Sequence, residues 1–456
     1  MPRFRCAHLF TGHRWLEDAI LEVDDDGTVA AVGPRGQAAE AQPLGVVVPG
    51  VPNLHSHAHQ RAMAGLAERT GPRGRGSFWT WRELMYRHLE AMTPDDLEAI
   101  AAQLYVEMLE AGFTAVGEFQ YLHHGPGGQP YEDPAEMTLR CLAAARAVGM
   151  GFTALPVLYA HGGFGGRPAG EGQRRFLCDL DLFHRIVDRL RTEIRPGAEG
   201  IGVAPHSLRA VTGEHLSRLL EDIDSDLPIH LHIAEQVREV EDCLAWSGTR
   251  PLRWLLDHVG VDRRWCLIHA THLDDGELAD LATSGAVAGL CPVTEANLGD
   301  GLFRAAEFTA AGGGFGIGSD SHISVSPVEE LRWLEYGQRL TSLGRNVLAG
   351  GPGRSTGRRL LAAALEGGAQ ACGRPIGTLE VGRRGDWLVL DDLHPLLACR
   401  RGDELLDSWI FSGNAPCVRE VWVGGRRVVA DGRHRDRGPV AARFLETLRR
   451  LRAELP

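Results

Sequence analysis

Short apolar segments that end in polar or ionisable residues recur along this 456-residue chain, and helical segments such as 95–112 and 134–150 separate them. Strands that alternate with helices in this way form right-handed βαβ units around a parallel sheet. Eight such units over roughly 270–330 residues fit a (β/α)₈ barrel. The eight predicted strands lie at 45–57, 114–120, 151–160, 201–207, 228–235, 265–272, 286–293 and 314–321.

Ionisable residues lie at or just past the ends of these predicted strands. In a (β/α)₈ barrel the carboxyl ends of the strands meet at one rim, which carries the catalytic groups. We therefore expect residues that are far apart in the sequence to gather in one site. They are His55, His57, Glu118, His206, His232, Glu235, His269 and Asp320.

The two ends of the chain have a different pattern. Residues 16–33 alternate and turn at Asp26-Gly27 like a β-hairpin, and 385–392 and 417–433 read as further strands. We expect both ends to form one small β-sandwich beside the barrel. The predicted divisions are 1–47 for the N-terminal part of the sandwich, 48–375 for the barrel, and 376–456 for the C-terminal part with a terminal helix.

Composition and charge exclude several classes of protein. The net charge of −12 argues against a nucleic-acid partner. No apolar run is long enough for a membrane span, the N-terminus has no secretory pattern, and the nine cysteines form no CxxC pair, so we expect a cytoplasmic protein. The chain also has no lysine, which excludes a P-loop, a Schiff base and a carboxylated lysine between two metals.

Three histidines alternate in the stretch VPNLHSHAHQ, at His55, His57 and His59. Alternation is the period of a strand, so all three side chains can face the same way. The outer two lie roughly 13 Å apart on a straight strand, whereas metal–nitrogen bonds are about 2.0–2.1 Å. At least one of the three is therefore not a ligand, and other strands must complete any metal site.

Two other strand ends offer such ligands. His232 ends the fifth strand, and Asp320 lies in GSDSH at the end of the eighth. Each alone could be a satisfied core or loop residue. Together with the His-x-His of the first strand they form a ring of nitrogen and oxygen donors suited to a divalent cation. Because no lysine can bridge two metals, we expect one ion, most simply Zn²⁺.

A hydrolytic metal site also needs groups that move protons, because the metal only brings the pKa of a bound water toward neutrality. Glu235 follows His232 by three residues in HIAE, and we expect it to transfer protons at the reacting centre. His269 ends the sixth strand and is expected to stabilise charge on oxygen. Asp320 is expected to orient or deprotonate the water. The plainer alternatives are a helix N-terminal residue for Glu235 and a supporting residue for His269.

Over its whole length the chain resembles the amidohydrolase superfamily, through the split β-sandwich and the motifs HSH, HIAE, HATH and GSDSH. Within it, the chain is similar to the mononuclear deaminases, and more narrowly to the formimidoylglutamate deiminase family of bacterial histidine degradation. His59 departs from the family pattern, in which we expect an aromatic residue such as Phe. The narrower likeness rests on PNLHSHAHQRAMAGLAE, SFWTWRELMY, GEFQYLHH, APHSLRAV and CPVTEANLGDG.

The resemblance implies metal-dependent deimination of N-formimino-L-glutamate to N-formyl-L-glutamate and ammonia, by a homodimer. It makes His55 and His57 the ligands of the HSH motif and leaves His59 aside. Gln60, Tyr121 and His206 are implied to contact the substrate.

Two arginines make physical sense of a dicarboxylate substrate in an acidic protein. Arg82 lies in FWTWRE and Arg209 lies just past the fourth strand. An arginine fork binds a carboxylate bidentately, although either residue alone would read as a solvated surface charge. Trp79 and Trp81 are expected to be packing residues of the same loop.

Two alternatives remain open. A related mononuclear deaminase could act on a guanidino acid or a heterocyclic base, but a base would call for amide and aromatic side chains and not for two arginines. A catalytically inactive barrel could serve as a binding protein, but such a chain is expected to have lost metal ligands or proton-transfer residues. Here all of them are present.

Overall fold

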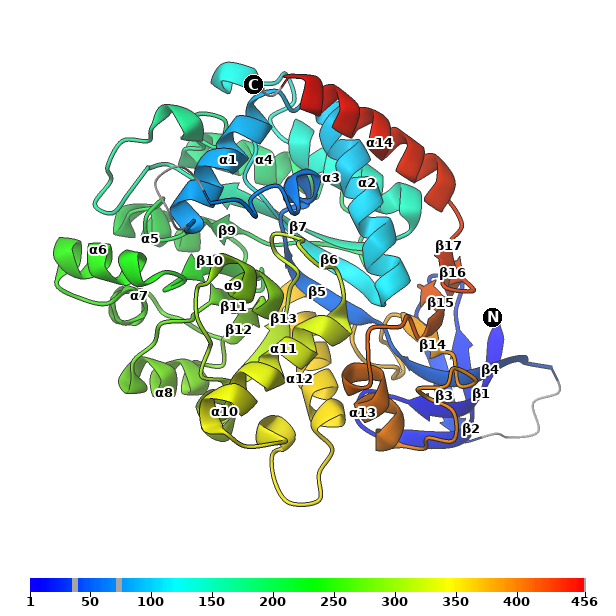
Figure 1. Ribbon diagram of the computed structural model, residues 1–456. Coiled ribbons are helices and arrows are strands. Elements are labelled where there is room, and N and C mark those ends of the chain that lie inside the picture. The colour runs from blue at the N-terminus through cyan, green and yellow to red at the C-terminus, as the bar shows by residue number, and fades with distance from the viewer. Residues whose placement is uncertain (35–39, 71–75, 455–456) are drawn as a thin grey trace.

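The computed structural model describes residues 1–34, 40–70 and 76–454, which form a mixed α/β structure (Figure 1). Two parallel sheets lie at its centre, in the orders β5-β6-β7-β8 and β10-β11-β12-β13. Their strands are β5 (Val51–Ser56), β6 (Phe113–Gln120), β7 (Gly151–Leu158), β8 (Glu199–Ile201), β10 (Ile229–Ile233), β11 (Trp265–His269), β12 (Val287–Leu290) and β13 (Gly314–Ile317), and the short β9 (Ala204–Pro205) pairs with β7.

The two sheets meet at two seams. One is a parallel bridge between Val203 and Ile229. The other joins the ends of β5 and β13, where the Asp320 N–H donates to the His55 carbonyl at 3.1 Å and the Asp320 carbonyl accepts from the His57 N–H at 3.3 Å. The strands therefore follow one another around a ring, which confirms the predicted (β/α)₈ fold.

Helices connect the strands and cover the outside of this ring (Figure 1). Thr93 caps α2 by accepting from the Asp96 N–H, and the helix ends before Gly112, whose φ of +109° suits glycine. The predicted helices over 95–112 and 134–150 are thus confirmed as α2 and α3. The helices after the first strand are α1 (Phe78–Glu90), α2 (Pro94–Ala111), α3 (Glu136–Val148), α4 (Leu180–Arg191), α5 (Gly213–Asp222), α6 (Val237–Ser247), α7 (Pro251–His258), α8 (Asp275–Ser284), α9 (Pro292–Leu298), α10 (Ala305–Ala310), α11 (Pro327–Ser342) and α12 (Thr356–Cys372).

Both ends of the chain join in one eight-stranded sheet, in the order β17-β16-β15-β14-β4-β1-β2-β3. The predicted hairpin is the antiparallel pair β2–β3, and Phe4, Trp387 and Trp422 pack in the apolar core beside the sheet. The exact divisions of the chain stay a prediction. The elements are β1 (Arg3–Phe10), β2 (Trp15–Val23), β3 (Val29–Pro34), β4 (Gln42–Pro49), β14 (Trp387–Leu390), β15 (Val418–Val423), β16 (Arg426–Ala430) and β17 (Arg433–His434), followed by α14 (Arg437–Glu454), while α13 (Asp403–Phe411) precedes β15.

The single strand predicted over 45–57 is wrong, because β4 belongs to the terminal sheet and β5 to the barrel. The chain passes between them at Gly50, where a Cβ would lie 2.2 Å from Thr114 Oγ1. Only glycine allows this close approach. The apolar residues continue through both strands, so the sequence shows one run.

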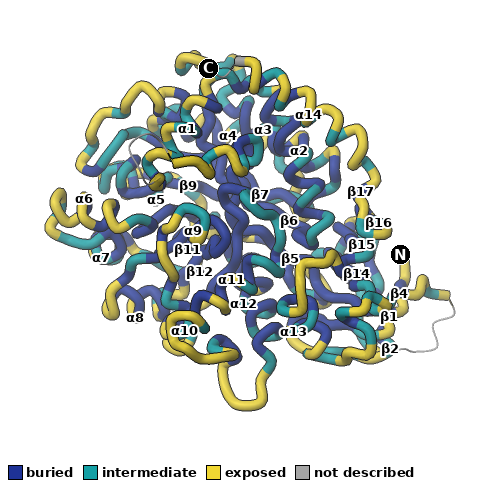
Figure 2. The backbone as a smooth tube through the Cα atoms, viewed as in Figure 1, coloured by how far each residue is buried: buried dark blue, intermediate teal, exposed yellow. Residues whose placement is uncertain are grey.

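Buried residues concentrate inside the ring and between the ring and its helices (Figure 2). Among the described residues, no helix combines the length and the hydropathy that a membrane crossing requires.

Candidate metal centre and substrate pocket

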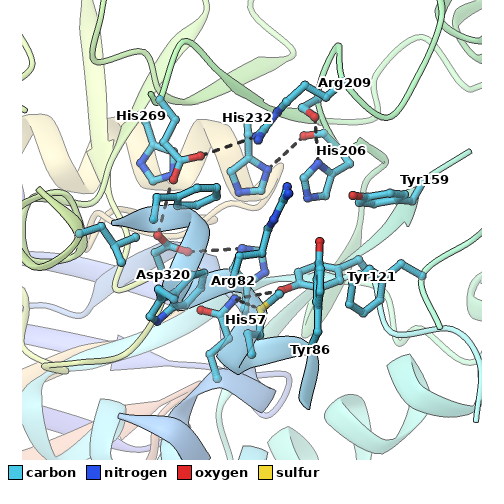
Figure 3. Close-up of a pocket in the computed structure, with 18 of the residues that line it drawn as sticks. His57, Arg82, Tyr86, Tyr121, Tyr159, His206, Arg209, His232, His269 and Asp320 are labelled. Atoms are coloured by element: carbon cyan, nitrogen blue, oxygen red, sulfur yellow. Dashed lines mark hydrogen bonds and ion pairs between the residues drawn. The ribbon is translucent and has the colours of Figure 1, made fainter. Parts of the chain in front are cut away.

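The predicted site residues come together in one pocket at the carboxyl ends of the barrel strands (Figure 3). His55 lies just below the pocket surface and is fully buried. Glu118 is the exception among the strand-end residues: it does not line the pocket, and its buried carboxylate accepts from Ser56 Oγ at 2.6 Å and from the Ala58 N–H at 2.7 Å. The other predicted site residues line the pocket: His57, Gln60, Arg82, Tyr121, His206, Arg209, His232, Glu235, His269 and Asp320.

Three of the histidines converge on one point. One ring nitrogen from each of His55, His57 and His232 lies within 4.8 Å of the others. The Nε2 atoms of His55 and His232 are 3.0 Å apart. Asp320 Oδ1 lies 3.3 Å from His57 Nε2 and 3.5 Å from His55 Nε2. The four residues predicted as metal ligands are therefore adjacent.

Backbone carbonyls fix the tautomers of two of these rings. His57 Nδ1 donates to the Phe119 carbonyl at 2.9 Å, and His232 Nδ1 donates to the His206 carbonyl at 3.1 Å. The lone pair of each Nε2 therefore faces the common point, which is the arrangement that metal-binding histidines adopt.

Burial keeps these rings neutral. It lowers the pKa of His57, and it lowers the pKa of both His55 and His232 well below the usual value, with neighbouring histidines adding to the effect. These neutral nitrogens face one another at close range, and the Asp320 carboxylate lies beside them. This donor set fits a divalent metal ion.

His59 takes no part in this cluster. Its side chain is buried, and its Nε2 lies 3.0 Å from the Tyr121 hydroxyl. The Tyr121 hydroxyl also accepts from Gln60 Nε2 at 2.9 Å. His59 therefore orders the tyrosine that lines the pocket.

The part of the pocket beside the histidine cluster, where the His269 ring stacks on the His232 ring at 5.6 Å between centroids, is charged. His269 Nε2 lies 3.8 Å from Glu235 Oε1 and 3.8 Å from Asp320 Oδ2, and its Nδ1 lies 3.3 Å from Glu295 Oε1. Burial lowers the pKa of His269, but the surrounding carboxylates, Glu235 first, more than offset this and raise it. The pKa of Glu235 is also raised, in this case by burial itself. A buried proton carrier of this kind is typical of an active site.

The two predicted carboxylate-binding arginines have different surroundings. Arg82 lies on α1, with its guanidinium 4.5 Å from the centre of the Trp79 ring, and Arg238 stacks on the same ring at 4.5 Å. Arg209 lies 3.7 Å from Glu235 and its side chain is 13% exposed. Trp79 is thus a packing residue, as predicted, whereas Trp81 also lines the pocket.

The backbone is strained where the site residues leave the strands. Positive φ angles occur at five non-glycine residues at or after the ends of β10, β11 and β13, and such conformations persist only where surrounding contacts hold them. These residues are Ala234, His269, Ala270, Asp320 and His322.

Sequence reasoning missed three residues of this region. Tyr86 and Tyr159 line the pocket, and Tyr159 directly follows β7, so its strand-end position could have revealed it. Glu239 is buried within 4.0 Å of Arg209. It follows Glu235 by four residues and lies in the first turn of α6, which begins at Val237.

Comparison with known proteins agrees with this arrangement. The profile of the amidohydrolase family matches residues 46–428. The chain belongs to the amidohydrolase family. A formimidoylglutamate deiminase from Pseudomonas aeruginosa is 55% identical over 435 residues, which cover 95% of this chain and 96% of that protein.

Solved structures of relatives share the fold of this amidohydrolase. The crystal structure of an amidohydrolase from Brucella melitensis has a TM-score of 0.94 and 50% identity, over 99% of this chain and 100% of that one. An adenosine deaminase from Xanthomonas campestris with bound zinc has a TM-score of 0.81 over 99% of this chain and 98% of that one. Its identity is 21%, so this likeness concerns the fold alone.

Proposed function

We propose that this amidohydrolase hydrolyses N-formimino-L-glutamate to N-formyl-L-glutamate and ammonia in histidine degradation. The observation that carries the proposal is the position of Arg82 and Arg209, which line the same pocket as the histidine cluster. The substrate carries two carboxylates, and arginine forks bind carboxylates bidentately. The 55% identity to a formimidoylglutamate deiminase supports the same substrate.

We propose one Zn²⁺ ion, held by His55, His57, His232 and Asp320. Nitrogen and oxygen donors suit zinc, and the adenosine deaminase of the same fold contains it. When bound, such an ion polarises the substrate and makes a water molecule acidic near neutral pH.

The protein groups divide the remaining work. Asp320 orients the attacking water and accepts its proton. Glu235 delivers a proton to the formimino nitrogen and takes up the hydroxyl proton of the tetrahedral intermediate, while the proton held by Asp320 reaches the same nitrogen. The C–N bond then breaks, ammonia leaves and both carboxyl groups return to their starting forms. The raised pKa of Glu235 suits it to carry a proton near neutral pH. His269 donates a hydrogen bond to the oxygen that becomes negatively charged.

The remaining pocket residues orient the substrate. Gln60 and Tyr121 are joined by a hydrogen bond and present amide and hydroxyl groups to it. His206 donates or accepts at its free ring nitrogen, because its Nδ1 is 3.0 Å from Ser207 Oγ. The enzyme is proposed to work in the cytoplasm as a homodimer of chains divided at 1–47, 48–375 and 376–456.

An ammonia-release assay of the zinc-loaded protein tests the substrate. We expect turnover with N-formimino-L-glutamate to exceed turnover with N-formimino-L-aspartate, guanidino acids and nucleobases. A preference for a guanidino acid or a nucleobase would overturn the substrate and leave the metal chemistry intact. Light scattering of the same sample tests the dimer.

A further inference from the structure

Arg209 is placed between two carboxylates, only one of which belongs to the proposed chemistry. Its Nη2 lies 3.7 Å from Glu235 Oε2 and 4.0 Å from Glu239 Oε2. Neither distance is that of a direct hydrogen bond. The arginine is therefore shared by the two carboxylates and committed to neither.

Glu239 is an unusual neighbour for a pocket arginine, because its side chain is completely buried on α6. Its Oε2 accepts from the backbone N–H of Glu235 at 3.1 Å. That N–H follows Ala234, whose φ is +49°. One carboxylate thus touches both the strained segment that carries Glu235 and the guanidinium of Arg209.

Two buried atoms of this group have no hydrogen-bond partner in the described part of the chain, Glu239 Oε1 and Arg209 Nε. Buried polar atoms are rarely left unpaired without a functional reason. Arg82, which lines the same pocket, offers a contrast, since among the described residues it forms cation–π contacts and no ion pair with a carboxylate. A dedicated counter-charge is thus specific to the arginine beside Glu235.

We propose that Glu239 is a positioning residue that holds Arg209 away from Glu235. Without its negative charge, Arg209 is drawn onto the one remaining carboxylate. The arginine then no longer faces the substrate carboxylate, and Glu235 is engaged in an ion pair. This inference rests on the proposed function, because it assigns Arg209 to the substrate and Glu235 to proton transfer.

The Glu239→Gln variant tests the inference, because glutamine keeps an oxygen that can accept from the Glu235 N–H but loses the charge. We expect kcat/KM for N-formimino-L-glutamate to fall by roughly tenfold to a hundredfold at unchanged zinc content, through a higher KM from the displaced Arg209 and a lower kcat from the engaged Glu235. Glu239→Asp, which keeps the charge, should recover much of the loss.

A double-mutant cycle separates positioning from a general structural effect. In an Arg209→Gln background, Glu239→Gln should change kcat/KM by less than about twofold, because the arginine through which it acts is gone. An equal loss in both backgrounds, or no loss in the Arg209 protein, overturns the proposal. If Glu239→Gln does not fold, Glu239→Ser, which also removes the charge, is measured in the two backgrounds by the same criterion.

Glu335→Gln is the matched control, because Glu335 is also fully buried and pairs with Arg339 at 2.7 Å, outside the pocket. It should lower the melting temperature without raising KM. The wild-type protein distinguishes the two levels of inference. If it releases no ammonia from N-formimino-L-glutamate, the proposed function fails, whereas an active wild type with an unaffected Glu239→Gln variant contradicts only the role of Glu239.

Discussion

The pocket contains buried histidines whose pKa values shift in opposite directions, the cluster of three on the one hand and the neighbouring His269 on the other. In the cluster, His55, His57 and His232 have lowered pKa values, because burial and neighbouring histidines disfavour the charge. His269, beside the cluster, is as deeply buried, yet the carboxylates of Glu235, Glu295 and Asp320 raise its pKa. The difference teaches that burial alone keeps a histidine here neutral and ready to bind a metal, and that several carboxylates together are needed to outweigh burial, as they do at His269.

The largest effect should come from removing a histidine of the cluster. In His232→Ala, we expect loss of the metal and a fall in turnover by about 10⁴-fold or more, because metal catalysis contributes several kcal/mol and each 1.36 kcal/mol is a factor of ten. Elemental analysis and ammonia release measure the two losses. Full zinc content in this variant would exclude His232 as a ligand. His230→Gln is a useful control, since its ring binds the Ala371 carbonyl below the site.

Substitutions at Glu235 and His269 should lower turnover without loss of the metal. We expect Glu235→Gln to keep its zinc and to lose about 10²–10⁴-fold in kcat, the usual worth of general acid–base catalysis. His269→Asn should behave in the same way. A variant that loses zinc together with activity would show that Glu235 and His269 also serve metal binding.

The two arginines sharpen the comparison, because each lies on a different element around the same pocket. We expect Arg209→Gln to lower kcat/KM by about 10–100-fold, in line with roughly 1.5–3 kcal/mol for a charged hydrogen bond, and Arg82→Gln to lie at the lower end of this range. The loss should appear mainly as a higher KM. Arg427→Gln, on the exposed terminal sheet, is the control and should leave KM unchanged.

The rule that barrel strands carry functional residues at their carboxyl ends explains how the sequence could predict so much of this site. It identified the histidine cluster, Glu235, His269 and Asp320, since each lies within a few residues of a strand end. The fold followed from the same alternation of strands and helices. The boundary between β4 and β5 at Gly50 could not be predicted, because one apolar run gives no sign that its two halves join different sheets.

Contacts between side chains from separate segments are what the sequence could not reveal. Glu239 lies on α6, and only the folded chain brings it to within 4.0 Å of Arg209. The pKa shifts of the cluster histidines and of His269 also depend on tertiary contacts, because they are set by which carboxylates lie beside each ring. Sequence spacing therefore predicts which residues form the site, but it does not predict which charged side chains lie beside each of them.

The smallest effect should come from His59, which tests whether a lowered pKa alone makes a ligand. Burial lowers the pKa of His59 well below its usual value, as for the cluster, yet its Nε2 pairs with the Tyr121 hydroxyl. His59→Phe should therefore keep full zinc content and change kcat/KM by less than about tenfold, since one net hydrogen bond is worth about 1 kcal/mol. Elemental analysis with steady-state kinetics measures both. Loss of zinc would mean that the third histidine of the motif reaches the metal, which its 3.0 Å contact with Tyr121 argues against.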